Sequence, residues 1–157
     1  MTAPGARDLL TRFWRELTDL RTGMLGLTRW DDAHAQPMTA HFDGEKGPLW
    51  FYARRDGDLA RGALDPGPAV FHYTGRGHDL YACLHGELQV TDDAQARARY
   101  WTEDVARWFP GGQDDPDLAM LRLTPSRVQI WLPRDSQAPT PFDLDGEPAD
   151  VRGQVRL

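Results

Sequence analysis

The sequence predicts a mainly β, α+β domain whose antiparallel strands close into a small barrel flanked by helices. Short apolar segments alternate with Gly, Pro and Asp turn signals along most of the chain, as in sheets built from hairpins. The predicted helices occur singly and do not follow every strand, which argues against a doubly wound parallel sheet. A length of 157 residues suits one domain, expected over residues 1–132. Beyond Pro133 the composition shifts to Pro, Asp, Ser and Gly, which predicts an extended C-terminal tail over 133–157.

The chain opens with a predicted amphipathic helix. Apolar residues recur there at three- and four-residue spacing from Leu9 to Leu20, and Gly23 is expected to end the helix. Strands are then predicted, in order, at 24–28, 36–42, 49–52, 69–74, 80–90, 118–123 and 127–132. The segment 80–90 is the clearest of them, because apolar and polar side chains alternate along it.

Two further helices are predicted between strands. A brief one lies near 59–64 and must end before Pro66, since proline cannot continue a helix. The other begins at Asp92 as N-cap, with Gln95 in the capping-box position, and carries an apolar stripe as far as Trp108. Strands 118–123 and 127–132 are expected to be separate elements joined at Pro125.

Composition limits the classes of function. The chain has 18 Lys and Arg against 24 Asp and Glu, and the net charge of −6 disfavours binding to nucleic acid or to an anionic membrane. No apolar run is long enough to cross a bilayer and the N-terminus has no signal pattern, so a cytoplasmic location is expected. With Cys83 alone, neither an intrachain disulfide nor a Cys-based zinc site can form. The five histidines are not at metal-ligand spacing, so no metal site is predicted.

No residue is predicted as a catalytic nucleophile or base. The chain contains no Gly-x-Ser-x-Gly elbow and no phosphate-binding glycine loop. The most suggestive cluster is Arg54 and Arg55, directly after an aromatic strand and before a short helix that carries Arg61. Arginines beside a helix N-terminus suit a phosphate group, whereas the alternative is a solvated charged turn. These residues alone leave both interpretations open.

Several segments form a pattern that runs in order from Phe13 to Trp131. The most specific segment is Trp108-Phe109-Pro110-Gly111-Gly112 followed by 114–118. The other segments are Phe13-Trp14, Gly23-Met24-Leu25, Gln36-Pro37-Met38, Leu49-Trp50-Phe51-Tyr52 with Arg55-Asp56, and Leu123-Thr124-Pro125 with Trp131. In this order they resemble the general stress protein branch of the pyridoxamine 5'-phosphate oxidase-like, FMN-binding split barrels.

This resemblance implies a six-stranded antiparallel split β-barrel, a homodimer, and FMN bound at the dimer interface. Carried over by position, the segment Gln36-Pro37-Met38-Thr39 would lie along the flavin. Arg54, Arg55 and Asp56 would surround the phosphate, and the helix with Trp101 and Trp108 would close over the ring.

Three departures from the family pattern affect that expected site. The arginine before Pro-Met is Gln36, the threonine after the aromatic strand is Ala53, and the family's lysine falls near Asp58 or Leu59. Each departure removes a contact, and a charge-assisted hydrogen bond contributes on the order of 1.5–3 kcal/mol. Three functions therefore stay open: an FMN-dependent oxidoreductase, a flavin-binding stress protein without turnover, and a cofactor-free dimeric interaction module. Haem or a deazaflavin is an alternative ligand.

Overall fold

A computed structural model describes residues 5–29, 34–45, 47–132 and 140–143 of the chain. One antiparallel sheet dominates it, with the strand order β2-β1-β4-β5-β6-β3 and with β7 paired to β6. The strands are β1 (Thr22–Leu27), β2 (Gln36–Thr39), β3 (Leu49–Arg54), β4 (Gly67–Thr74), β5 (Tyr81–Val90), β6 (Leu118–Trp131) and β7 (Thr140–Asp143).

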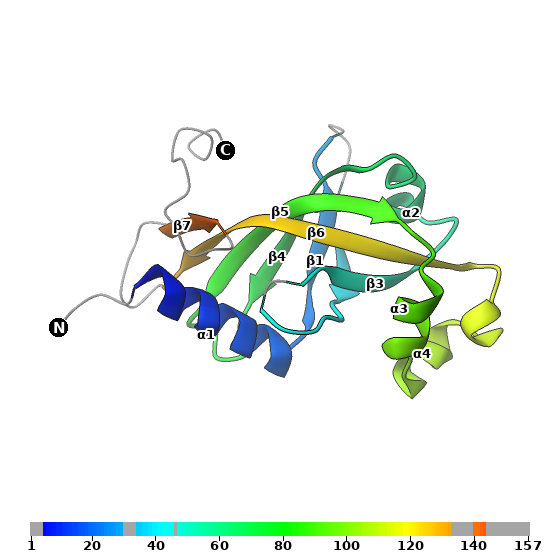
Figure 1. Ribbon diagram of the computed structural model, residues 1–157, viewed down its shortest axis with the longest axis horizontal. Coiled ribbons are helices and arrows are strands. Elements are labelled where there is room, and N and C mark those ends of the chain that lie inside the picture. The colour runs from blue at the N-terminus through cyan, green and yellow to red at the C-terminus, as the bar shows by residue number, and fades with distance from the viewer. Residues whose placement is uncertain (1–4, 30–33, 46, 133–139, 144–157) are drawn as a thin grey trace.

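The two ends of the six-stranded path meet, so the sheet curls into a nearly closed barrel. Directly after β2, His41 forms a β-bridge to Trp50 of β3, with N···O distances of 2.9 and 2.7 Å. The predicted split-barrel architecture, six antiparallel strands with flanking helices, is confirmed (Figure 1).

Helix α1 (Ala6–Asp19) covers the barrel core, as its apolar stripe predicts. Phe13 and Leu17 are fully buried, and the Tyr73 hydroxyl of β4 donates a 2.7 Å hydrogen bond to the Glu16 carbonyl. The helix ends at Asp19, so the expectation that Gly23 ends it is wrong. Gly23 lies within β1, where a Cβ atom would come 2.6 Å from both the His72 carbonyl oxygen and the Phe71 ring. A close packing contact therefore requires this glycine.

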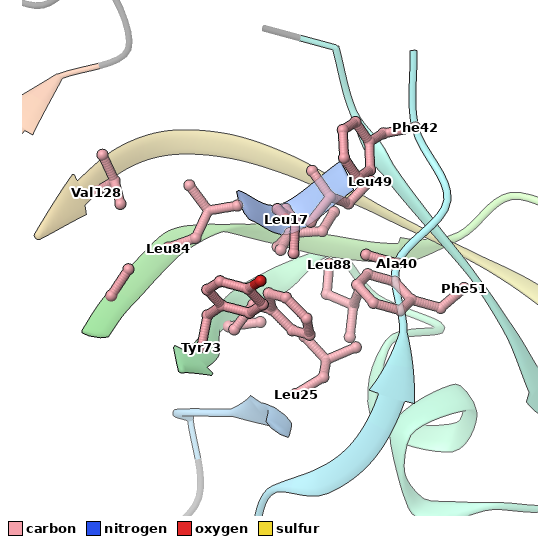
Figure 2. Packing of buried hydrophobic residues seen from close by; sticks show 14 of the residues in the cluster. Leu17, Leu25, Ala40, Phe42, Leu49, Phe51, Tyr73, Leu84, Leu88 and Val128 are labelled. Carbon is pink, nitrogen blue, oxygen red and sulfur yellow. The ribbon is translucent and has the colours of Figure 1, made fainter. Parts of the chain in front are cut away.

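The barrel interior is filled by buried aliphatic and aromatic side chains from β1, β3, β4, β5 and β6, and the partly buried Met38 of β2 packs against them (Figure 2). On β5 the predicted alternation is observed, because Ala82, Leu84 and Leu88 are buried. Phe51 and Phe71 lie fully buried at a centroid distance of 5.6 Å. This single core holds β1 through β6 in place and fixes the walls of the site described below.

β6 runs unbroken from 118 to 131, so the two predicted strands are one element. Its pairing with β5 shifts register between His85 and Gly86, which oppose Arg127 and Pro125. Ser126 is therefore an extra residue on β6, as in a β-bulge, and the bulge lets the strand pass through Pro125.

The long helix predicted up to Trp108 is two helices, α3 (Ala94–Arg99) and α4 (Glu103–Trp108). The cap of α3 is Asp93, whose side chain accepts from the Ala96 amide, and not Asp92 as predicted. Thr102 caps α4 by accepting from the Val105 amide at 3.3 Å. The chain therefore begins a new helix at this point, and α3 and α4 are not continuous. Both helices pack on the outside of β3 and β6, at the end of the molecule opposite α1 (Figure 1). The remaining helix, α2 (Asp58–Gly62), follows β3.

Candidate functional site

A groove of about 680 Å³ lies between the strand wall formed by β2 and the end of β3 and the helix wall formed by α4. Its lining is mainly apolar, and the charged side chains in it are Arg21, Arg54 and Asp104. It is lined by Arg21, Thr22, Gln36, Pro37, Met38, Thr39, His41, Tyr52, Ala53, Arg54, Gly57, Leu59, Thr102, Asp104, Val105, Trp108 and Phe109.

The structure brings together six of the eight residues expected at a cofactor. Gln36, Pro37, Met38 and Thr39 form one wall of the groove, Arg54 lies at its edge, and Trp108 faces it from α4. Arg55 and Asp56 are not among the lining residues. Trp101, the other tryptophan considered for the ring, packs edge-on against Tyr52 at a centroid distance of 5.7 Å.

Trp108 is the most exposed large apolar side chain of the described residues, with 77% of its surface accessible. It is the last residue of the short helix α4; Val105 within that helix and Phe109 directly after it are buried and pack with Leu118 on the outside of the sheet. An indole left open beside an apolar groove provides a stacking surface for a planar ring.

His41 contributes to the groove and was not predicted from the sequence. Only 8% of its surface is accessible, and its ring lies 5.3 Å from that of Tyr52 and 5.8 Å from that of Tyr100. Burial, with a smaller effect of the nearby Arg21 guanidinium, lowers the pKa of His41 from 6.5 to about 4. The imidazole is therefore neutral at pH 7, and it adds no positive charge to the groove.

Tyr52 is held in place by its hydroxyl, which donates a 2.6 Å hydrogen bond to the Arg97 carbonyl of α3. Burial raises the pKa of Tyr52 to about 12. A phenol in this state stays protonated near neutral pH, so Tyr52 fixes the β3 wall against α3 and is not a proton acceptor for a ligand.

Arg54 is the cation at the β3 end of the groove. Its Nε donates to Asp56 at 3.2 Å, and this hydrogen bond, together with the charges of Asp56, Asp117 and Asp115, raises the pKa of the guanidinium. The side chain is 59% exposed, so its remaining donors face water and can reach an anionic ligand.

Arg55 points to a different partner from Arg54. Its guanidinium donates two hydrogen bonds to the Asp92 carboxylate, at 3.1 and 2.9 Å, and a third to the Leu118 carbonyl at 2.6 Å. Asp92 precedes α3 by two residues, and 37 positions separate it from Arg55. The sequence gives no signal for this pairing, because local patterns do not reveal which distant carboxylate a turn arginine reaches.

The other candidate reactive side chains lie elsewhere, on β4 and β5. The Cys83 sulfur lies 3.4 Å from Nδ1 of His72, and burial raises the pKa of the thiol. In the part of the chain that the structure describes, no three His, Cys, Asp or Glu side chains come together so as to hold a metal ion. Within the same residues, no helix has the length and apolar character needed to cross a membrane.

Two solved structures are similar to the chain over most of its length. The general stress FMN/FAD binding protein from Xanthomonas citri is 38% identical, with 84% of this chain and 94% of that chain covered and a TM-score of 0.76. A general stress family protein from Xanthomonas campestris pv. campestris is 39% identical, with 88% and 94% covered and a TM-score of 0.76.

General stress protein 26 of Bacillus subtilis (strain 168) is 27% identical over 67 residues. That match spans 43% of this chain and 45% of the relative. The matched part is therefore less than half the length of that protein. The family model described as "Pyridoxamine 5'-phosphate oxidase like" matches residues 8–152, which is most of the sequence. The match includes the barrel and the groove residues from Arg21 to Phe109. The chain therefore belongs to the pyridoxamine 5'-phosphate oxidase-like family.

Proposed function

We propose that the groove between β2, β3 and α4 binds FMN. The observation that supports this most is the pairing of the wall Gln36–Thr39 with the open indole of Trp108 across an apolar cavity of about 680 Å³. A cavity of this size and lining suits a ligand with a planar ring. The Xanthomonas citri relative, 38% identical over 84% of this chain, is an FMN/FAD binding protein.

In this proposal each part of the groove meets one part of the ligand. The backbone of Met38 and Thr39 lies along the ring, and Trp108 covers it from α4. Arg54 receives the phosphate, because its guanidinium is the lining cation beside the β3 turn and keeps donors exposed to solvent. When bound, the flavin would supply the electron-transfer chemistry, and the protein would hold and orient it.

The departures from the family pattern are expected to limit affinity. Ala53 and Leu59 both line the groove, and Leu59, one of the two positions near which the family's lysine falls, is apolar and 4% exposed. Losing two or three polar contacts of about 1.5–3 kcal/mol each weakens binding by two or more orders of magnitude. We therefore expect FMN to bind at least a hundredfold more weakly than it would with those contacts present.

A homodimer is part of the same proposal, as is the cytoplasmic location predicted from the sequence. The groove is open to solvent on one side, where Trp108 stands exposed, and a second subunit would complete its wall. Light scattering should then give twice the 17.8 kDa mass of one chain. A mass of 17.8 kDa at the concentrations used for binding would contradict the dimer.

The binding proposal is tested by titrating the apo-protein with FMN and following flavin fluorescence. One FMN per chain is expected, and Arg54→Gln should weaken FMN binding about tenfold while leaving riboflavin, which lacks the phosphate, unchanged. Arg76→Gln is the matched control, since Arg76 is a similarly exposed arginine paired to Asp19 and outside the groove lining. No saturable binding of FMN at high micromolar concentration would overturn the proposal.

Whether the bound flavin turns over is a separate measurement. Rapid flavin reduction by NADH or NADPH would make the protein an FMN-dependent oxidoreductase, and no reduction would leave a flavin-binding stress protein.

The second candidate function is a cofactor-free dimeric module. The observation that favours it is the acidic surrounding of Arg54, where Asp56, Asp115 and Asp117 compete with any phosphate. A colourless purified protein that is dimeric and does not bind FMN, haem or a deazaflavin would support it.

A further inference from the structure

Arg55 and Asp92 form the most extensively bonded ion pair near the groove. Both guanidinium NH groups of Arg55 donate to the two carboxylate oxygens of Asp92, and one of them also donates to the Leu118 carbonyl. This parallel two-bond geometry fixes direction as well as distance between the partners. The pair therefore ties the turn after β3 to the segment between β5 and α3.

The backbone at Asp92 is shaped around this contact. Asp92 has a φ of 48°, in the left-handed region that few residues other than Gly, Asn and Asp adopt. Its carboxylate also accepts from the Met120 amide at 3.4 Å and lies 3.6 Å from Arg97. The next residue, Asp93, caps α3, so the contacts of Asp92 lie directly before the start of that helix.

Arg97 extends the network toward α4. Its guanidinium donates to the Gln113 carbonyl at 3.1 Å, in the short η1 helix (Gly112–Asp114) that follows α4. Its own carbonyl accepts the Tyr52 hydroxyl from the groove wall. We call Arg55, Asp92 and Arg97 the brace. Along the chain, helix α4 lies between Arg97 and Gln113, so the hydrogen bond from Arg97 links the segments that precede and follow the helix wall of the groove.

We propose that Arg55 is a positioning residue, which sets the distance between the strand wall with Arg54 and the helix wall with Trp108 through Asp92 and Arg97. This proposal rests on the proposed flavin-binding function. It differs from a direct phosphate contact by Arg55, because two of its NH groups are already bonded to Asp92 and it is not among the residues that line the groove.

The two roles of Arg55 predict opposite effects of changing Asp92. If Arg55 acts through the brace, Asp92→Asn loosens α4 and weakens binding. If Arg55 contacts the phosphate, Asp92 competes for it, and Asp92→Asn tightens FMN binding. Asparagine also tolerates a positive φ, so the substitution removes the charge without straining the backbone.

The experiment compares Arg55→Gln, Asp92→Asn and the double variant in the full chain. Each is titrated with FMN and with riboflavin. The matched control is the pair Arg76→Gln and Asp19→Asn, another exposed Arg–Asp pair with an N···O distance of 2.9 Å. Amide hydrogen exchange of residues 103–109 is measured in the absence of flavin, with the amides of β5 as the internal reference.

The brace predicts about three- to tenfold weaker binding of both flavins in each single variant, and no further loss in the double variant. It also predicts faster exchange in α4 with β5 unchanged. A loss confined to FMN in Arg55→Gln, tighter FMN binding in Asp92→Asn, or unchanged exchange in α4 would overturn the proposal. If the wild-type protein binds no flavin, the proposed function fails, while the exchange comparison still decides whether the brace holds α4.

Discussion

The buried imidazole of His41 predicts that acid destabilises this protein well above the pH at which carboxylates titrate. Burial lowers the pKa of His41 to about 4 in the folded state, whereas an unfolded chain has a histidine pKa of 6.5. As the pH falls below 6.5, the unfolded state therefore binds a proton first. The contribution of neutral His41 to the free energy of unfolding is complete above pH 6.5. It is lost as the pH falls from 6.5 to 4.

The size of this loss follows from the two pKa values. At pH 5 the unfolded chain is almost fully protonated at this site and the folded chain is about one-tenth protonated, which gives a loss of roughly 2 kcal/mol. A domain of this size has a total stability of about 5–15 kcal/mol, so the effect is a large share of it.

The measurement is urea denaturation at pH 7.5 and at pH 5, for the wild-type protein and for His41→Gln. The variant keeps a polar side chain at this position but cannot titrate there. We expect its free energy of unfolding to fall by about 2 kcal/mol less than that of the wild type between the two pH values. Equal losses in the two proteins would refute the assignment of a neutral, buried His41.

Three further predictions concern the barrel. Leu84→Ala removes a side chain with no accessible surface, and chemical denaturation should show that the free energy of unfolding falls by about 3–5 kcal/mol. A fall below about 1 kcal/mol would mean that this side chain of β5 does not face the core. Gly86→Ala brings a Cβ to within 2.9 Å of backbone atoms of Thr124 and Pro125, so the free energy of unfolding should fall by about 1–3 kcal/mol. A free energy of unfolding equal to that of the wild type would contradict the close approach of the two strands at the bulge. Tyr73→Phe removes the hydrogen bond to Glu16 and should lower the free energy of unfolding by about 1 kcal/mol, whereas no change would show that the hydroxyl contributes nothing.

The fold could be predicted largely because its elements carry local periodic signals. The alternation along β5 and the stripe of α1 follow from which side chains each element must bury. The errors occur where a tertiary contact overrides a local rule. Pro125 should end a strand, but a bulge accommodates it, and Gly23 should end a helix, but its close contact with β4 places it inside β1.

The site was predictable only where its residues are neighbours in sequence. Gln36–Thr39 forms one continuous wall and matches a short motif as a unit, and Trp108 belongs to the most specific segment of the resemblance. His41 also lines the groove, but nothing in the local pattern separates it from core residues. The partner of Arg55 depends on how β3 and the start of α3 come together in space.

The pairing of β3 with β6 has a consequence for how the molecule assembles. Sequence-adjacent pairs such as β4 with β5 need only a short loop to close, whereas β3 pairs with β6 across more than sixty intervening residues. Contacts of high sequence separation form late, since the entropy of the enclosed chain must be lost first. Tyr52, Ala53 and Arg54 of β3 line the groove, so this part of its wall takes its final shape only when β3 pairs with β6. The ability to bind a ligand there therefore follows that late pairing. A ligand that binds there would stabilise the part of the native state that forms last.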